Sequence, residues 1–175
     1  MMITVLVSSC LVGNPVRYNG VDVPCPSSIL DAWKAENRIV PVCPEVAGGL
    51  PIPRPPAEIQ GGTGADVLRG TASVADIAGN LVTDSFVAGA EAALALARRH
   101  NARLAVLKEK SPSCGSSLIY DGTFSGKAFP GQGVTTALLE ANGIRVFSDL
   151  QLEAAAAYLH QLEEQSQTNP PQIEV

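Results

Sequence analysis

The stretch RLAVLKEKSPSCGSS, residues 103–117, decides the fold because it joins a buried strand to a loop that carries a cysteine. Its first half is a continuous aliphatic run, which is typical of a strand buried on both faces of a parallel sheet. Its second half is rich in Ser, Pro and Gly, which end a strand and form loops. The same arrangement recurs at ITVLVSSC, residues 3–10, and at RIVPVC, residues 38–43. Pro41 lacks a backbone donor, so it predicts that residues 38–43 form an edge strand or end there.

Helical patterns separate these strands along the chain. We predict helices within residues 26–37, 85–100, 131–143 and 149–165, and a last short strand within residues 144–149. Strands that alternate with helices imply a parallel sheet with right-handed crossovers. The sequence therefore predicts an α/β fold: a single three-layer domain with a mainly parallel, Rossmann-like sheet and β-hairpin insertions.

The insertions are expected where the alternation of strands and helices is interrupted. Residues 43–64 are so rich in Pro and Gly that we predict an irregular loop. Residues 66–84 carry a Gly-Asn turn and residues 117–129 an Asp-Gly turn, and each segment is predicted to form a hairpin. We expect the domain to cover residues 1–161 and the polar end, residues 162–175, to be a frayed tail.

Composition favours a small-molecule partner. The chain has 175 residues, with 17 acidic against 12 basic side chains and a formal net charge of −5. Nucleic-acid binding depends on many Lys and Arg contacts to phosphates, so we expect no nucleic-acid partner. No apolar segment approaches the roughly 18 residues that cross a membrane, and the N-terminus lacks the basic region of a signal peptide. We expect no membrane association, a cytoplasmic location, and a monomer or weak homodimer.

The cysteines are the strongest functional signal. Ligands of parallel sheets bind outside the carboxyl ends of the strands, and Cys10, Cys43 and Cys114 each follow a predicted strand end. We therefore expect three thiols from three strands to share one crevice. Four cysteines in a chain without a leader favour metal binding or catalysis over disulfides. The alternative for any one of them is a buried thiol that acts as a small hydrophobic side chain.

Thiolates that share a site need a cation, and zinc or an iron–sulfur cluster is the soft-metal choice. Structural zinc takes four ligands, and Cys25 is the candidate for the fourth; a partly exposed loop thiol is the alternative reading of Cys25. Three cysteines on a cubane cluster instead leave one iron without a protein ligand, where a substrate can bind.

Three long blocks of the sequence resemble the signatures of the family formerly called domain of unknown function 523. These blocks are SSCLVGNPVRYNG at 8–20, PVCPEVAGGLPIPRPPAEI at 41–59 and LKEKSPSCGSS at 107–117. The resemblance extends over about residues 3–160, nearly the whole chain. Some members of the family are 2-thiouracil desulfidases.

The resemblance implies a [4Fe–4S] cluster held by Cys10, Cys43 and Cys114, with its fourth iron open. It also implies that Glu45 works beside the cluster, for which general acid/base catalysis is our hypothesis, and that Ser111 lies near the substrate. The implied reaction is a hydrolytic, non-redox desulfuration of a thiolated pyrimidine at the open iron, giving uracil and hydrogen sulfide. The alternatives are a four-cysteine structural metal module and a desulfidase or sulfur-transfer enzyme that acts on another thiolated small molecule.

Other polar residues of the same blocks are candidates for binding the small thiolated heterocycle. Ser9, Ser111 and Ser113 either contact the substrate or form local side-chain-to-backbone bonds that close their turns, and a bond from Ser9 to a cluster sulfide is a further alternative. Arg17 either contacts the substrate or pairs with a carboxylate such as Glu58.

Overall fold

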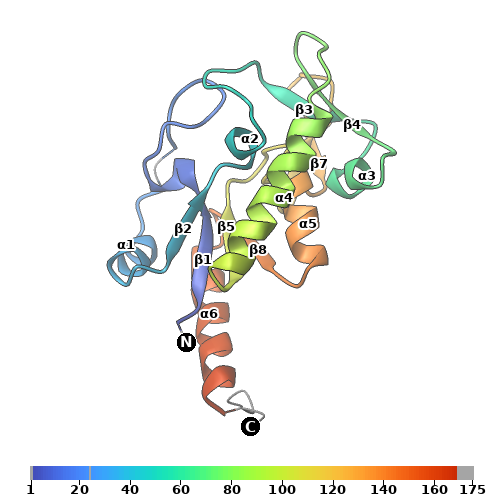
Figure 1. Ribbon diagram of the computed structural model, residues 1–175. Helices are drawn as coiled ribbons and strands as arrows, with labels where there is room; N and C mark the ends of the chain where they lie inside the picture. The colour runs from blue at the N-terminus through green and yellow to red at the C-terminus, as the bar shows by residue number, and fades with distance from the viewer. Residues whose placement is uncertain (1, 24, 169–175) are drawn as a thin grey trace.

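The computed structural model describes residues 2–23 and 25–168 (Figure 1). Its elements, in chain order, are β1 (Thr4–Ser8), the 3-10 helix η1 (Ser9–Val12), α1 (Ser28–Ala35), β2 (Ile39–Val42), α2 (Pro44–Ala47), β3 (Ala57–Gln60), α3 (Gly64–Leu68), β4 (Ser73–Asp76), α4 (Thr83–Arg99), β5 (Ala102–Leu107), β6 (Leu118–Tyr120), β7 (Ala128–Pro130), α5 (Val134–Ala141), β8 (Arg145–Ser148) and α6 (Leu152–Thr168).

The central sheet is parallel throughout, which confirms the predicted fold class. Its strand order is β2-β1-β5-β8, and each neighbouring pair runs in the same direction. β2 lies at the edge, as its proline predicts, with Pro41 in register with Val7 of β1. All four strands therefore present their carboxyl ends at one edge of the sheet.

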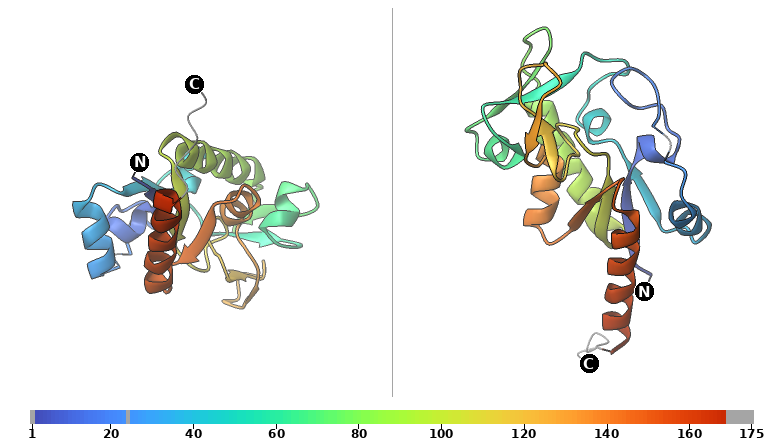
Figure 2. Two further views of the ribbon diagram at one scale, coloured as in Figure 1. Left: turned by 90° about the horizontal axis from the view of Figure 1, so that it is seen from below. Right: turned by 180° about the vertical axis from the view of Figure 1, so that it is seen from behind.

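Helices cover both faces of this sheet and complete the three layers. α4 lies in front of the sheet in Figure 1, whereas α6 is in front in the view from behind (Figure 2). Each face of the sheet packs against its own hydrophobic core. Side chains of β1 alternate between these two cores, because successive residues of a strand point to opposite faces. Val5 packs in one core with Trp33 of α1 and Leu159 of α6. Leu6 packs in the other core with Ala93 of α4.

The predicted hairpin of residues 117–129 is confirmed, because β6 and β7 pair in antiparallel fashion. The expectation of an irregular loop over residues 43–64 is wrong, since α2 and β3 both lie within it. Each is four residues long, too short to produce a hydrophobic period. α2 begins with Pro44, whose fixed φ and missing N–H suit the first turn of a helix, so a proline there starts an element instead of preventing one.

Within residues 66–84 the predicted hairpin is present only as a short one, in which the N–H of Asp76 donates to the carbonyl of Asn80 and the N–H of Val82 donates to that of Val74. Its β4 pairs with β3 from the proline-rich segment, and within 66–84 only an isolated antiparallel bridge joins Ala75 to Leu81. Before β4 the chain forms α3, which begins at a capping box made by Thr63 and Asp66. The turn signal was real, but a partner strand from outside the segment completed the pairing.

The C-terminal helix α6 continues through Thr168, past the expected domain boundary at residue 161. The remainder of the expected tail, residues 169–175, lies outside the described residues. Among the described residues, no helix combines the length and the hydropathy needed to cross a membrane.

Candidate functional site

The carboxyl edge of the sheet holds a cavity of about 420 Å³, and three cysteines line it. Cys10 lies on η1 directly after β1, and Cys43 lies between β2 and α2. Cys114 lies in the loop after β5. The structure thus brings together the thiols that follow three neighbouring parallel strands, as the position of ligand sites in such sheets requires.

The thiols are withdrawn from solvent, which disfavours their charged form. Burial raises the pKa of Cys10 to about 11; the positive charge of Arg17 opposes that rise, and the nearby Cys43 thiol adds to it. Burial raises the pKa of Cys114 to about 12, against a hydrogen bond from Ser113. Burial also raises the pKa of Cys43. Without a cation all three thiols are protonated at neutral pH, so a bound metal group has to displace their protons.

Cys25 occupies a different place. Its thiol donates a hydrogen bond to the backbone carbonyl of Asp149 at 3.9 Å, and it lines a second cavity with Pro26 and Leu150. Within residues 2–23 and 25–168, no three His, Cys, Asp or Glu side chains converge on the position of a single metal ion. The sulfur donors that line the main cavity are those of Cys10, Cys43 and Cys114.

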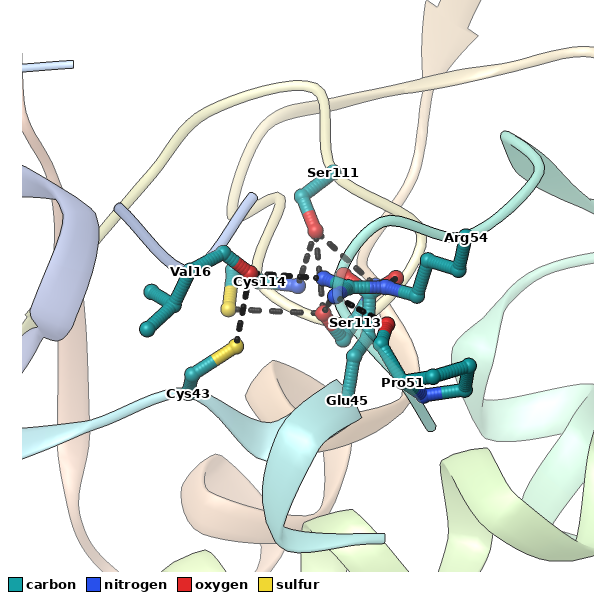
Figure 3. Close-up of polar contacts among 8 residues, drawn as sticks. All are labelled: Val16, Cys43, Glu45, Pro51, Arg54, Ser111, Ser113 and Cys114. Carbon is teal, nitrogen blue, oxygen red and sulfur yellow. Dashed lines mark hydrogen bonds and ion pairs between the residues drawn. The ribbon is translucent and has the colours of Figure 1, made fainter. Parts of the chain in front are cut away.

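Glu45 lies in the first turn of α2 and is fixed at both carboxylate oxygens (Figure 3). Arg54 Nε lies 3.3 Å from Oε1, and Ser113 Oγ lies 3.2 Å from Oε2. The same Ser113 Oγ is 3.5 Å from the sulfur of Cys114. One chain of polar contacts thus joins a buried cation, a carboxylate, a hydroxyl and a thiol along the cavity.

Arg54 was not identified from the sequence. Its side chain is only 4% exposed, and its guanidinium also donates to the carbonyl oxygens of Pro51 and Val16. An arginine flanked by prolines in the segment IPRPP was the available signal, because a buried cation has to be paired. The pairing itself depended on α2, which the sequence did not reveal.

Ser111 and Ser113 of the cysteine loop both line the cavity, and Ser111 also bonds to the loop backbone. Ser111 Oγ accepts hydrogen bonds from the N–H groups of Ser113 and Cys114, both at 3.2 Å, and lies 2.9 Å from Ser113 Oγ. The turn-closing role expected as an alternative is therefore present for Ser111. Both residues line the cavity, so this role does not remove them from the site.

Ser9 and Arg17 also line the cavity. Ser9 is buried, and Arg17 lies with its guanidinium carbon 5.7 Å from the centre of the Tyr18 ring. Among the described residues Arg17 forms no ion pair with Glu58, whose carboxylate instead accepts the N–H groups of Gly122 and Phe124. Arg17 is thus a cationic side chain at the cavity, close enough to Cys10 to lower its pKa.

Glu109 braces the loop that carries Cys114. Its Oε1 accepts hydrogen bonds from the N–H groups of Lys110, Ser116, Ser117 and Leu118. Burial alone would raise the pKa of Glu109, but these backbone donors together outweigh it and lower the pKa below its usual value. The sequence analysis did not identify this bracing role of Glu109.

The chain is similar to known proteins in family, sequence and structure. The family model described as 2-thiouracil desulfurase matches residues 5–151. An uncharacterized protein of Bacillus subtilis (strain 168), YbbK, is 50% identical over 148 residues, which cover 85% of this chain and 97% of that protein. A solved structure described as the [4Fe-4S]-dependent thiouracil desulfidase TudS is 48% identical, with a TM-score of 0.84, and the match covers 91% of this chain and 99% of that one.

Proposed function

The chain belongs to the 2-thiouracil desulfurase family, and on this premise we propose that it is an iron–sulfur enzyme that removes sulfur from 2-thiouracil or a closely similar thiolated pyrimidine. The observation that carries the proposal is the cavity shared by Cys10, Cys43, Cys114 and Glu45. Three sulfur donors and a carboxylate meet the two needs of the reaction, which are to hold a soft metal group and to move protons.

The thiolates of Cys10, Cys43 and Cys114 would hold a [4Fe–4S] cluster, the cofactor named for the similar solved structure. This donor set fits such a cluster, because each thiolate binds its own iron and the sulfurs need not converge on one ion. With three protein thiolates on four irons, one iron would be left for the substrate, and the cluster would supply Lewis acidity toward the carbon–sulfur bond.

Glu45 is the proposed general acid/base. Its carboxylate is held by Arg54 and Ser113, so it keeps one position beside the cavity. In the proposed reaction the oxygen of one water replaces the substrate sulfur. Glu45 takes the two protons of that water in turn, the first as the oxygen bonds to carbon and the second as the carbonyl forms, and passes both to the departing sulfur. The products are uracil and hydrogen sulfide, and no electrons are gained or lost overall.

The remaining polar residues of the cavity are assigned to the substrate. Ser111 and Ser113 lie beside Glu45 and offer hydroxyls to the reacting end of the pyrimidine, while Ser9 and Arg17 offer donors to its carbonyl oxygen and ring nitrogens. We further propose a cytoplasmic location, because reducing conditions keep the cysteines free to bind iron.

The experiment that tests the function is anaerobic reconstitution followed by turnover. Iron and acid-labile sulfide are quantified per chain, and uracil and free sulfide are then measured after incubation with 2-thiouracil. We expect a brown protein with four irons per chain and equal amounts of uracil and sulfide without any added sulfur acceptor. A colourless zinc protein, or loaded protein that releases no uracil, would contradict the proposal. Turnover only with an added acceptor would indicate a sulfur-transfer enzyme instead.

A further inference from the structure

The main cavity also has an aromatic and apolar part that the proposed chemistry does not use. Tyr120 and Phe124 of the β6–β7 hairpin line it, together with Ile77, which follows β4. These residues come from the two insertions, whereas the thiols come from the parallel sheet. One cavity therefore combines a polar, sulfur-bearing part with a part formed by aromatic rings and aliphatic side chains.

The backbone at Phe124 is held in an unfavourable conformation. Its φ is +56°, in the left-handed region that a bulky residue rarely adopts. The N–H of Phe124 donates to Oε1 of Glu58 at 3.2 Å, and the N–H of Gly122 donates to the same oxygen at 3.0 Å. Because Glu58 is buried on β3, these bonds fix the hairpin tip to the neighbouring insertion.

A second set of contacts presses the same tip against β3. The side-chain amide of Gln60 donates to the carbonyl of Gly122 at 2.9 Å. A Cβ at Gly122 would lie 2.7 Å from the carbonyl oxygen of Ile59, so only glycine permits this approach. The tip is thus fixed by contacts within the protein. Phe124, whose backbone is in the left-handed region, lines the cavity from this tip. Backbone strain of this kind is kept where the surrounding structure over-determines it, and such positions cluster at ligand sites.

We propose that Phe124 binds the flat ring of the substrate by stacking, and so determines specificity for planar heterocycles over acyclic thioamides. This inference rests on the proposed function and adds the residue that recognises the ring itself. An aromatic ring can stack on any planar base, because every base has a π-face. A rigid ring also orients the pyrimidine, so that its sulfur faces the part of the cavity that holds Cys10 and Glu45.

The test compares Phe124→Gly, Phe124→Tyr and the control Lys127→Ala, which changes an exposed residue of the same hairpin. Each reconstituted protein is assayed for kcat and KM with 2-thiouracil, for the Kd of uracil by calorimetry, and for Tm. For Phe124→Gly we expect KM and Kd to rise roughly tenfold and kcat to change less than twofold. Its Tm should not fall, because glycine adopts the left-handed backbone without strain.

Phe124→Tyr should restore most of the affinity because it keeps an aromatic ring, and Lys127→Ala should match the wild type. The proposal is overturned if Phe124→Gly leaves both KM and Kd within twofold of wild type, or if Lys127→Ala raises them equally. A wild type that binds uracil but releases no sulfide from 2-thiouracil contradicts the proposed function alone, and the uracil Kd values still decide the role of Phe124. A wild type that binds no uracil overturns the stacking role as well.

Discussion

Arg54 and Glu45 form a largely buried ion pair, with Arg54 Nε 3.3 Å from Glu45 Oε1 and side chains only 4% and 17% exposed. The pair joins the IPRPP loop between α2 and β3 to the first turn of α2. Ser113 holds the other carboxylate oxygen of Glu45 from the cysteine loop. The position of the proposed acid/base therefore depends on α2, on the loop that carries Arg54 and on the loop that carries Ser113. Substitutions in each of these segments can test it.

Replacement of Arg54 should impair both stability and turnover. Arg54→Ala leaves the Glu45 carboxylate without its cation and frees the carbonyl oxygens of Val16 and Pro51. Removing one partner of a buried pair costs about 3 kcal/mol of unfolding free energy. A displaced carboxylate should also lower kcat at least about tenfold. Denaturant unfolding and steady-state kinetics measure the two effects.

The matched control is Arg69→Ala, because Arg69 also pairs with a carboxylate but its side chain is 64% exposed. Exposed pairs contribute little, so this variant should stay within about 0.5 kcal/mol of wild type and keep full turnover. Arg54→Lys should rescue only in part, since an ammonium lacks the planar fork that reaches three partners. Wild-type kinetics in Arg54→Ala would remove Arg54 from the positioning of Glu45.

Glu45→Gln tests the proton-transfer role directly. The amide keeps the size of the side chain and can still accept from Ser113, but it cannot take a proton from water at neutral pH. We expect kcat to fall by roughly 100-fold or more, while iron and sulfide content stay at the wild-type level. Iron analysis and visible absorbance check the cluster, and sulfide release checks turnover. Full activity in this variant would exclude Glu45 as the acid/base.

The fold and the convergence of the cysteines could be predicted from local sequence, but much of the site could not. Strands such as β5 are recognised by their aliphatic runs. The position of Cys114 after the end of β5 can therefore be predicted without knowledge of tertiary contacts. In contrast, α2 and β3 are too short for periodicity, and the Glu45–Arg54 pair depends on both the helix and the loop after it. The fixed position of Phe124 depends on Glu58, which is 66 residues away in the chain. Contacts of this kind are set by packing, and no spacing rule identifies them.

Serine substitution of each cysteine should distinguish a cluster site with three cysteine ligands from one with four. Cys10→Ser, Cys43→Ser and Cys114→Ser each replace a soft sulfur donor by a hard oxygen and should lower the iron bound per chain by more than half. Cys25→Ser should retain the cluster, because the Cys25 thiol bonds to the carbonyl of Asp149 in a separate cavity. Equal iron loss in Cys25→Ser would instead support a four-cysteine site.

Glu109 should make the stability of the protein sensitive to acid. Its folded pKa lies below the usual value, because the backbone N–H bonds outweigh burial. A lowered pKa stabilises the folded state at pH values above the unfolded pKa of about 4.3, and that contribution is lost as pH falls through the lower folded value. The loop that carries Cys114 loses its brace in the same range.

The variant Glu109→Gln tests this assignment. Its neutral carbonyl accepts the backbone bonds less strongly, so the free energy of unfolding at pH 7 should fall by about 2 kcal/mol. Between pH 5 and pH 3 the stability of the variant should fall less steeply than that of wild type. Parallel dependence on pH in the two proteins, measured by urea unfolding, would show that Glu109 does not contribute to acid sensitivity.

The contact between α4 and α2 gives a prediction in which two effects oppose each other. Gly89 lies within α4, where Gly→Ala normally stabilises a helix by about 1 kcal/mol. A Cβ at Gly89 would lie 2.0 Å from the carbonyl oxygen of Pro44, however, so α2 has to move. Overpacking of this kind costs about 1–3 kcal/mol, and the overlap with backbone places Gly89→Ala at the upper end. We expect a net loss of about 2 kcal/mol.

The displacement of α2 should also reduce turnover, since Glu45 follows Pro44 directly on that helix. The control Ala95→Gly, at an exposed position of the same helix, measures the intrinsic difference between Ala and Gly and should destabilise by about 1 kcal/mol with normal kinetics. If Gly89→Ala instead stabilises the protein by the amount that Ala95→Gly destabilises it, the close approach of α2 to α4 does not position Glu45. A loss of stability together with a lower kcat at unchanged iron content would link the packing of α4 to the chemistry of the cavity.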